Sequence, residues 1–125
     1  MALFGDKNPY KRDFSKDEIN QPIWNILKTY DAFSEDQRII LLSGRSAEYR
    51  DITEKWLADN GVSYDALFMR AAGDVRKDSI IKEEIYRAEI ENKYNVLFVL
   101  DDRDQVVQLW RSLGLTCLQV AEGNF

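Results

Sequence analysis

The run Val96-Leu97-Phe98-Val99-Leu100-Asp101-Asp102-Arg103 decides the fold that we predict for this chain. Its five consecutive apolar residues are too few to span a membrane and lack helical periodicity, which is typical of a strand covered on both faces in a parallel sheet. Ligands bind beyond the carboxyl ends of such strands, so Asp101 and Asp102 are placed to hold a cation or a polar substrate. Aspartate also favours helix starts, and from the strand alone both roles are equally expected.

The composition is that of one ordinary globular domain. The chain has 125 residues, of which 45% are hydrophobic and 31% charged, and its net charge of -5 argues against a broad basic surface for nucleic acid. One cysteine, Cys117, excludes an internal disulfide, and its apolar neighbours predict a core position. With no histidine, chemistry here has to use carboxylates, lysine, arginine and a hard metal ion. The absence of a long apolar segment or signal-peptide core predicts a cytoplasmic protein without a membrane anchor.

Strands and helices alternate along the chain. We expect strands at residues 39–42, 67–69, 96–100 and 116–120, and helices at residues 16–30, 47–60, 78–91 and 104–113. Helical spacing predicts these inward residues: Ile23, Leu27, Tyr30, Tyr49, Ile52, Trp56, Leu57, Ile81, Ile85, Ala88, Val106, Val107, Trp110 and Leu113. Gly61 and Gly114 are placed to end helices, and Asp51 and Lys55 to form a surface pair. This alternation predicts an α/β fold, with right-handed crossovers, a parallel sheet and helices on both faces.

Polar residues follow each predicted strand, and this topology brings them to one edge of the sheet. The Ser43 hydroxyl and the amides around Gly44 suit a phosphate oxygen, helped by the dipole of the following helix. A Ser-Gly pair after a strand is nevertheless more often a simple turn. Arg45 and Arg70 suit bidentate contacts with phosphate or carboxylate, although each is equally acceptable as a surface arginine.

Lys82 stands early in the third predicted helix, where the helix dipole disfavours a cation. We therefore expect an anion beside it, either a bound phosphate or a carboxylate such as Asp78 or Asp102. Asp101 and Asp102 are oxygen ligands of the kind that Mg²⁺ accepts one or two at a time while it keeps several waters. The convergence of these groups favours a site over a set of unrelated helix caps.

The order of these residues resembles a known superfamily. Ser43-Gly44-Arg45 after one strand, Lys82 in a later helix and Asp101-Asp102-Arg103 after the next strand resemble the second, third and fourth motifs of the haloacid-dehalogenase (HAD) phosphohydrolases. More narrowly, the chain is similar to the phosphatase domain of phage-type bifunctional polynucleotide 5'-kinase/3'-phosphatases. Longer runs at residues 73–78, 82–85, 101–107 and 119–125 carry that similarity, which covers residues 2–125.

The resemblance implies an HAD-like Rossmannoid sheet and a Mg²⁺-dependent reaction. In the family, one aspartate attacks the 3'-phosphate to form an aspartyl-phosphate, and a second aspartate two residues later acts as general acid and base. Both belong to a first motif, Asp-x-Asp-Gly-Thr, at the end of a central first strand. The 125 residues do not contain this motif, and the first four align with the segment that follows it in the family. We therefore expect residues 1–125 to form a single HAD-like domain that is N-terminally truncated and lacks its central first strand. We expect this domain to bind Mg²⁺ weakly and to be inactive alone.

The resemblance also implies roles for individual residues. Lys82 would offset the negative charge of the transition state, and Asp78 would hold a basic group in place. Lys7 stands where the family has an arginine, so a bidentate phosphate contact is lost there. The implied assignments are Lys82 and Asp78 for catalysis, Ser43, Gly44 and Lys82 for phosphate, Lys7, Arg45, Arg70 and Arg103 for substrate, and Asp101 and Asp102 for Mg²⁺.

Three functions remain open at this stage. The first is a 3'-phosphatase domain acting on 3'-phosphorylated DNA or RNA ends, with a kinase domain as a partner or its first strand supplied in trans. The second is a non-catalytic module that binds phosphate or nucleic-acid ends. The third is a HAD phosphatase acting on small nucleotides, which the long family-specific runs disfavour.

Overall fold

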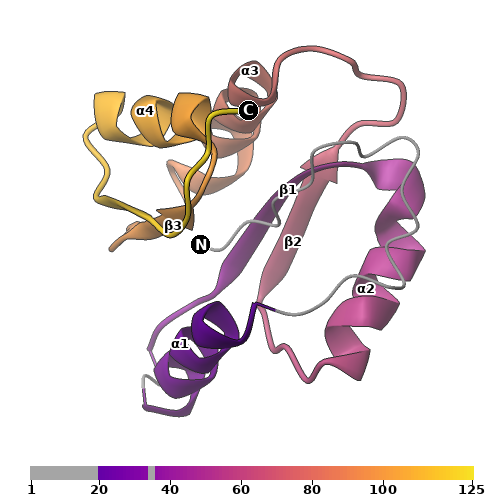
Figure 1. Ribbon diagram of the computed structural model, residues 1–125, viewed down its shortest axis with the longest axis vertical. Helices are drawn as coiled ribbons and strands as arrows, with labels where there is room; N and C mark the ends of the chain where they lie inside the picture. Colours follow the sequence, from indigo (N-terminus) through magenta and orange to yellow (C-terminus); the bar gives the residue numbers. More distant parts are fainter. Residues whose placement is uncertain (1–19, 34–35) are drawn as a thin grey trace.

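The computed structural model describes residues 20–33 and 36–125 (Figure 1). The elements in chain order are α1 (Gln21–Phe33), β1 (Ile40–Ser46), the short 3-10 helix η2 (Ala47–Tyr49), α2 (Arg50–Asp59), β2 (Ala66–Arg70), α3 (Asp78–Ile85), the π-helical segment η3 (Tyr86–Ile90), β3 (Val99–Asp101), α4 (Asp104–Ser112) and β4 (Cys117–Gln119). This order confirms the predicted alternation of helices with parallel strands. The predicted start of the first helix, at residues 16–19, lies outside the described residues.

The strands form two parallel pairs. β1 pairs with β2, placing Ile40 opposite Ala66, and β3 pairs with β4, placing Val99 opposite Cys117. Within residues 20–33 and 36–125, β1 and β3 do not pair with each other, and in Figure 1 β3 lies apart from β1 and β2. In this part of the chain β3 pairs, in parallel, with β4 alone.

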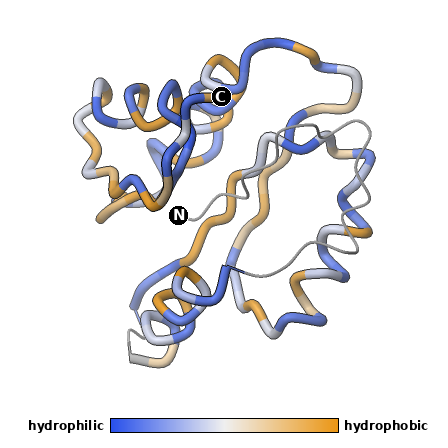
Figure 2. Tube along the Cα trace, in the orientation of Figure 1, coloured by the Kyte–Doolittle hydropathy of each residue, from blue (hydrophilic) through white to orange (hydrophobic). Residues whose placement is uncertain are grey.

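Both faces of the β1–β2 pair are covered, because successive residues of a strand point to opposite sides. One cluster packs against α1 and α2 and contains Trp24, Leu27, Ile39, Leu41, Trp56, Leu57, Leu67 and Met69. The other packs toward η3, α4 and the second strand pair and contains Ile40, Leu42, Tyr86, Ile90, Val99, Val106, Val107, Trp110 and Cys117. Figure 2 shows hydrophobic residues along β1 and β2 and hydrophilic ones on the outer turns of the helices. The predicted core position of Cys117 is confirmed.

The strand ends differ from the prediction in a way that matters for the site. β1 runs on to Ser46, so Ser43-Gly44-Arg45 belongs to the strand and not to a following loop. The pairing with β2 shifts register between Ser43 and Ser46, which is the irregularity that a β-bulge produces. β3 is shorter than predicted, since Leu97 is 51% exposed and the strand begins only at Val99.

The helices bury somewhat different residues than their spacing predicts. Ala88 is exposed, whereas Tyr86 and Ile90 are buried. The reason is the π-helical turn of η3, in which the Glu91 amide donates to the Tyr86 carbonyl at 2.8 Å. A π-turn holds one residue more than an α-turn, so it rotates the following side chains away from the predicted stripe.

Two further core predictions are corrected. In α2, Ile52 is 38% exposed and Thr53 is buried in its place, and in α1 the unpredicted Trp24 is buried against Trp56 with ring centroids 6.0 Å apart. Lys55 pairs with Asp59 at 2.6 Å, not with Asp51.

The predicted helix ends are confirmed at two glycines. Gly61 and Gly114 have φ of 69° and 82°, the left-handed conformation that favours glycine after a helix. Among the residues that the structure covers, no helix has the length and apolar character needed to cross a membrane.

Candidate functional site

Buried polar side chains gather where β1, β2 and β3 end. They are Ser43, Arg45, Ser46, Arg70, Asp78, Lys82 and Asp101. A buried charge is costly unless it is paired, so a fold retains such a group only where its partners are built in beside it. This edge is the one that the topology predicts as the binding edge.

Asp78 is the point at which the cations of the site meet. Its Oδ2 lies 3.1 Å from Lys82 Nζ and 3.5 Å from Arg103 Nη1, while its Oδ1 lies 3.4 Å from Arg70 Nη2. Asp78 is the first residue of α3, where the helix dipole also favours a carboxylate. The anion that we predicted beside Lys82 is therefore confirmed as Asp78, one helical turn before it. Within the described residues, Asp78 is shared by these three cations, and the Asp101 carboxyl also lies within the influence of the Lys82 charge.

Gly44 allows this cluster to form. A Cβ at this position would lie 2.4 Å from Asp78 Oδ1, so any side chain would displace the carboxylate. The Gly44 carbonyl accepts a hydrogen bond from Arg70 Nε at 2.7 Å. Next to it, the buried Ser43 hydroxyl oxygen accepts from the Arg45 amide at 3.1 Å. The glycine thus serves the close approach of β1 to α3, a requirement that the sequence alone did not reveal.

Arg45 and Arg70 are not surface arginines, since only 3% and 6% of them is exposed. Arg70 donates from Nη1 to the carbonyls of Asp74 and Arg76 at 3.1 and 2.6 Å, in addition to its bond to Gly44. Its guanidinium therefore fixes the 71–77 loop at the start of α3. Most of its donors already have acceptors inside the protein, which limits what it can offer to a substrate.

Asp101 and Asp102, although adjacent, have different surroundings. Asp101 is 1% exposed; its Oδ2 accepts from Trp110 Nε1 at 2.9 Å and its Oδ1 from the Asp102 amide at 2.8 Å. Burial raises the pKa of the Asp101 carboxyl, and the charge of Lys82 opposes that rise. The Asp102 carboxylate is half-buried and, within the described residues, accepts no hydrogen bond and forms no ion pair.

This difference separates the two predicted metal ligands. Both oxygens of Asp101 are engaged inside the protein, whereas Asp102 is available. One carboxylate fits Mg²⁺, which binds through one or two carboxylates and keeps several waters. No group of three or more His, Cys, Asp or Glu side chains suited to a metal occurs in residues 20–33 and 36–125. Sequence reasoning placed Trp110 in the core but missed its bond to Asp101, for which the sequence carries no local signal.

Arg103 links the loop that carries Asp102 to the Asp78 cluster. Its guanidinium carbon lies 4.7 Å from the centroid of the Phe125 ring, and its Nη1 lies 3.5 Å from Asp78. Lys7, the remaining predicted site residue, lies outside the described residues.

The order of parallel strands and helices, with buried polar groups at one strand edge, is that of an HAD-like domain. The whole chain, residues 1–125, matches the sequence model described as the polynucleotide kinase PNKP phosphatase domain. The chain therefore belongs to the family of PNKP phosphatase domains.

Solved structures support the same relationship. A chain of the Pnkp1/Rnl/Hen1 complex is 41% identical, has a TM-score of 0.88, and is matched over 99% of this chain and 46% of its own length. A chain of the Pnkp1/Rnl/Hen1 RNA repair complex is 44% identical, has a TM-score of 0.86, and is matched over 92% of this chain and 39% of its own length.

A relative in Autographa californica nuclear polyhedrosis virus is described as a candidate bifunctional polynucleotide kinase/RNA ligase. It is 34% identical over 118 residues, which cover 92% of this chain and 17% of the viral protein. The chain thus spans less than half of each of these three relatives.

Proposed function

We propose that this domain removes the 3'-phosphate from nucleic-acid ends in a Mg²⁺-dependent reaction. The observation that carries the proposal is the buried cluster of Lys82, Arg70 and Arg103 around Asp78, beside Ser43 and the available Asp102. Preorganised cations of this kind stabilise the charge of a transferring phosphoryl group without having to reorganise.

Each residue has a separate task in this proposal. Lys82 Nζ and the Ser43 hydroxyl hold the phosphoryl oxygens, and the ion pair at 3.1 Å with Asp78 keeps the lysine in position. Asp102 holds Mg²⁺, which when bound would neutralise part of the phosphate charge. Trp110 holds Asp101, which supports the metal loop from inside.

We propose that the nucleophile comes from a strand that carries the Asp-x-Asp-Gly-Thr motif, which the 125 residues do not contain. We infer that this strand lies between β1 and β3, either as part of a longer chain or from a partner. In support, β1 and β3 pair outward with β2 and β4 and not with each other in the described part.

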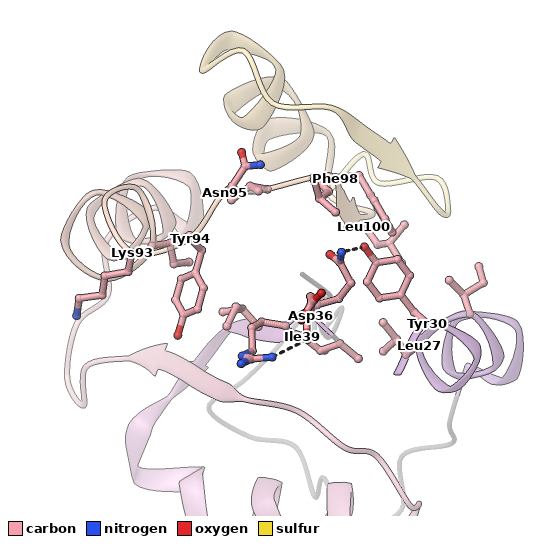
Figure 3. Close-up of a pocket in the computed structure, with 16 residues that line it drawn as sticks. Leu27, Tyr30, Asp36, Ile39, Lys93, Tyr94, Asn95, Phe98 and Leu100 are labelled. Atoms are coloured by element: carbon pink, nitrogen blue, oxygen red, sulfur yellow. Dashed lines mark hydrogen bonds between the residues drawn. The ribbon is translucent and has the colours of Figure 1, made fainter. Parts of the chain in front are cut away.

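A pocket of about 340 Å³ supports the same position for the strand. Figure 3 shows that its walls come from α1, the start of β1 and the segment leading into β3. Ile39, Ile40, Phe98 and Leu100 are among the lining residues, so the pocket offers apolar surface to a buried strand. Figure 3 also labels Tyr30, whose ring meets Phe98 edge-on with centroids 5.6 Å apart.

The experiment compares two proteins on a 3'-phosphorylated oligonucleotide with Mg²⁺. We expect no phosphate release from the 125-residue chain and clear release from the same chain extended by an N-terminal strand ending in Asp-x-Asp-Gly-Thr. The matched control carries Asn in place of the first aspartate of that motif and should release none. Turnover by the unextended chain would overturn the claim that it lacks a nucleophile.

The relatives favour RNA ends over DNA ends. The solved structures are of complexes described with Rnl and Hen1, one of them as an RNA repair complex, and the viral relative is described as a kinase/RNA ligase. We therefore propose that the domain works beside kinase and ligase activities. The extended chain should release phosphate faster from a 3'-phosphorylated RNA than from DNA of the same sequence, and faster from either than from a 3'-mononucleotide.

A second candidate is a module that binds phosphorylated ends without hydrolysing them. The observation in its favour is that Lys82 and Asp78 already pair with each other in a chain that contains no Asp-x-Asp-Gly-Thr motif. An extended chain that folds and binds 3'-phosphorylated RNA but releases no phosphate would establish this alternative.

A further inference from the structure

The residues from Gln119 to Phe125 pack against the loop that carries Asp102. Gln119 Nε2 donates to the Asp102 carbonyl at 2.9 Å and to Asp104 Oδ1 at 2.6 Å. One residue on, the Val120 amide donates to the Asp101 carbonyl at 3.0 Å. This C-terminal segment, residues 119–125, thus bonds to the end of β3, the loop and the start of α4.

Gly123 makes the closest of these approaches. A Cβ here would lie 1.8 Å from the Asp102 carbonyl oxygen and 2.7 Å from the Arg103 Cα, both of them backbone atoms that cannot move aside alone. The Gly123 carbonyl accepts from the Asp104 amide at 2.8 Å, and so bonds a backbone group at the first turn of α4. Gly123 is buried, while its neighbours Glu122 and Asn124 are exposed. Only glycine fits the contact.

The segment ends on Arg103. The Phe125 ring lies 4.7 Å from the Arg103 guanidinium carbon, within the range of a cation–π contact. Together, these contacts bind the backbone of the turn at residues 102–104 and the side chains of Asp104 and Arg103. The Asp102 carboxylate itself accepts no hydrogen bond within the described residues, so its direction depends on the backbone that carries it.

We propose that Gln119 and Gly123 are positioning residues that aim the Asp102 carboxylate at the metal. The proposal rests on the assignment of Mg²⁺ to Asp102 under the proposed function. Groups that orient a metal ligand typically account for about 10- to 100-fold in metal affinity. Gln119 donates two hydrogen bonds to the turn and lies outside the core clusters, so its loss acts mainly on the turn.

The test measures metal and phosphate binding separately on the 125-residue chain. Mn²⁺ replaces Mg²⁺ because it broadens the amide NMR signals of nearby residues, here those of Asp102 and Arg103. Inorganic phosphate is titrated against the amide signals of Ser43 and Gly44. The variants are Gln119→Ala, Gln119→Glu and Gly123→Ala, and the matched control is Asn124→Ala, an exposed amide side chain in the same segment.

We expect Gln119→Ala to need roughly tenfold more Mn²⁺ for the same broadening while phosphate binding stays within about twofold of the parent. Gln119→Glu should be weaker still, because its carboxylate would face the Asp102 carbonyl and the Asp104 carboxylate. Gly123→Ala should shift the turn signals even if it folds poorly, and Asn124→Ala should match the parent.

Three results would overturn the inference: parent-like Mn²⁺ binding by Gln119→Ala, equal loss of Mn²⁺ and phosphate binding by that variant, or no broadening at Asp102 in the parent. None of the three decides the proposed function, which is judged by phosphate release from the extended chain.

Discussion

Asp78 receives cations from three different parts of the chain: Arg70 at the end of β2, Lys82 in α3 and Arg103 before α4. Removing one partner of a buried ion pair leaves the other charge uncompensated. Removing a partner that three cations share takes the same anion from all three. The stability of the site edge and its charge balance therefore depend on this one carboxylate.

Asp78→Asn should lower the free energy of unfolding by about 3–5 kcal/mol, because three buried or half-buried cations lose their common anion. Urea unfolding measures the change. Asp59→Asn is the matched control, since the Asp59–Lys55 pair is exposed and its loss should change little. Equal effects of the two substitutions would show that the cluster contributes no more than a surface pair.

Trp110→Phe should destabilise the protein by about 1–3 kcal/mol beyond the loss of ring volume, because Asp101 Oδ2 is left buried without its donor. A double-mutant cycle with Asp101→Asn separates the bond from the packing. If the two effects simply add, the indole and the carboxylate are not coupled and the hydrogen bond is unimportant.

At the residue scale, the sequence predicts which side chains form the site better than it predicts how each side chain is oriented. The pairing of Lys82 with Asp78 was predictable, since the spacing of four residues places both on one helix face. The residue pattern alone did not separate the roles of Asp101 and Asp102, because the burial of Asp101 and its bond from Trp110 depend on other elements. The orientation of Arg70 depends on loop carbonyls whose path no local pattern specifies.

Among the elements, α3 is held at its start by an exposed network as well as by the buried one. Arg76 bonds Asp74 and Glu84, at 2.8 and 2.6 Å, and so joins the 71–77 loop to the second turn of the helix. Hydrogen bonds from the Arg76 side chain and backbone lower the pKa of Asp74 from 3.8 to about 2, and the Arg76 side chain also lowers the pKa of Glu84.

These lowered pKa values predict how the network responds to acid. Between pH 3.8 and about 2 the unfolded chain binds more protons at Asp74 than the folded one, so the contribution of Asp74 is complete above that window and is lost as the pH falls through it. Arg76→Gln should therefore lower the thermal midpoint at neutral pH, and the difference from the parent should vanish toward pH 2.

Thermal unfolding at a series of pH values checks this, with Lys55→Gln as a control that removes an exposed helix pair to Asp59. A difference between parent and Arg76→Gln that stays constant down to pH 2 would contradict the assignment to Asp74 and Glu84.

Element boundaries were less predictable than element types. The four expected strands and the three expected helices of residues 36–125 occur in order, except that the expected 78–91 helix changes to a π-turn after Ile85. Periodicity assumes a constant rotation per residue, so it fails at Ala88, where the π-turn changes that rotation. β1 continues through Ser43-Gly44-Arg45 because β2 pairs with it across an irregular register, a tertiary effect that overrides the turn preference of Ser and Gly.

For the whole molecule, the strand pairing is the least predictable feature and the most consequential. The parallel α/β class follows from the alternation of elements, but hydrogen bonds join strands far apart in sequence, and the pattern of one strand does not specify its neighbours. Within the described residues β1 pairs with β2 and β3 pairs with β4, and β1 and β3 do not pair with each other.

Adding the Asp-x-Asp-Gly-Thr strand should therefore change stability as well as activity. We expect the extended chain to unfold at a higher temperature than the 125-residue chain, because the strand buries apolar surface beside Ile40 and Leu100 and covers exposed strand edges. An extension of the same length with alternating Lys and Gly residues should not stabilise. Equal midpoints for all three proteins, measured by calorimetry, would show that the strand does not dock.

The division of the strands into two pairs also separates the chemistry of the site. Ser43 and Arg70 belong to the β1–β2 pair, whereas Asp101 and Asp102 belong to the end of β3. Under our proposal, the strand that joins the two pairs also carries the nucleophile, so assembly and catalysis become one event. Such a protein would work as a complementation reporter: phosphate released from a 3'-phosphorylated oligonucleotide would count the chains in which the two halves had been brought together.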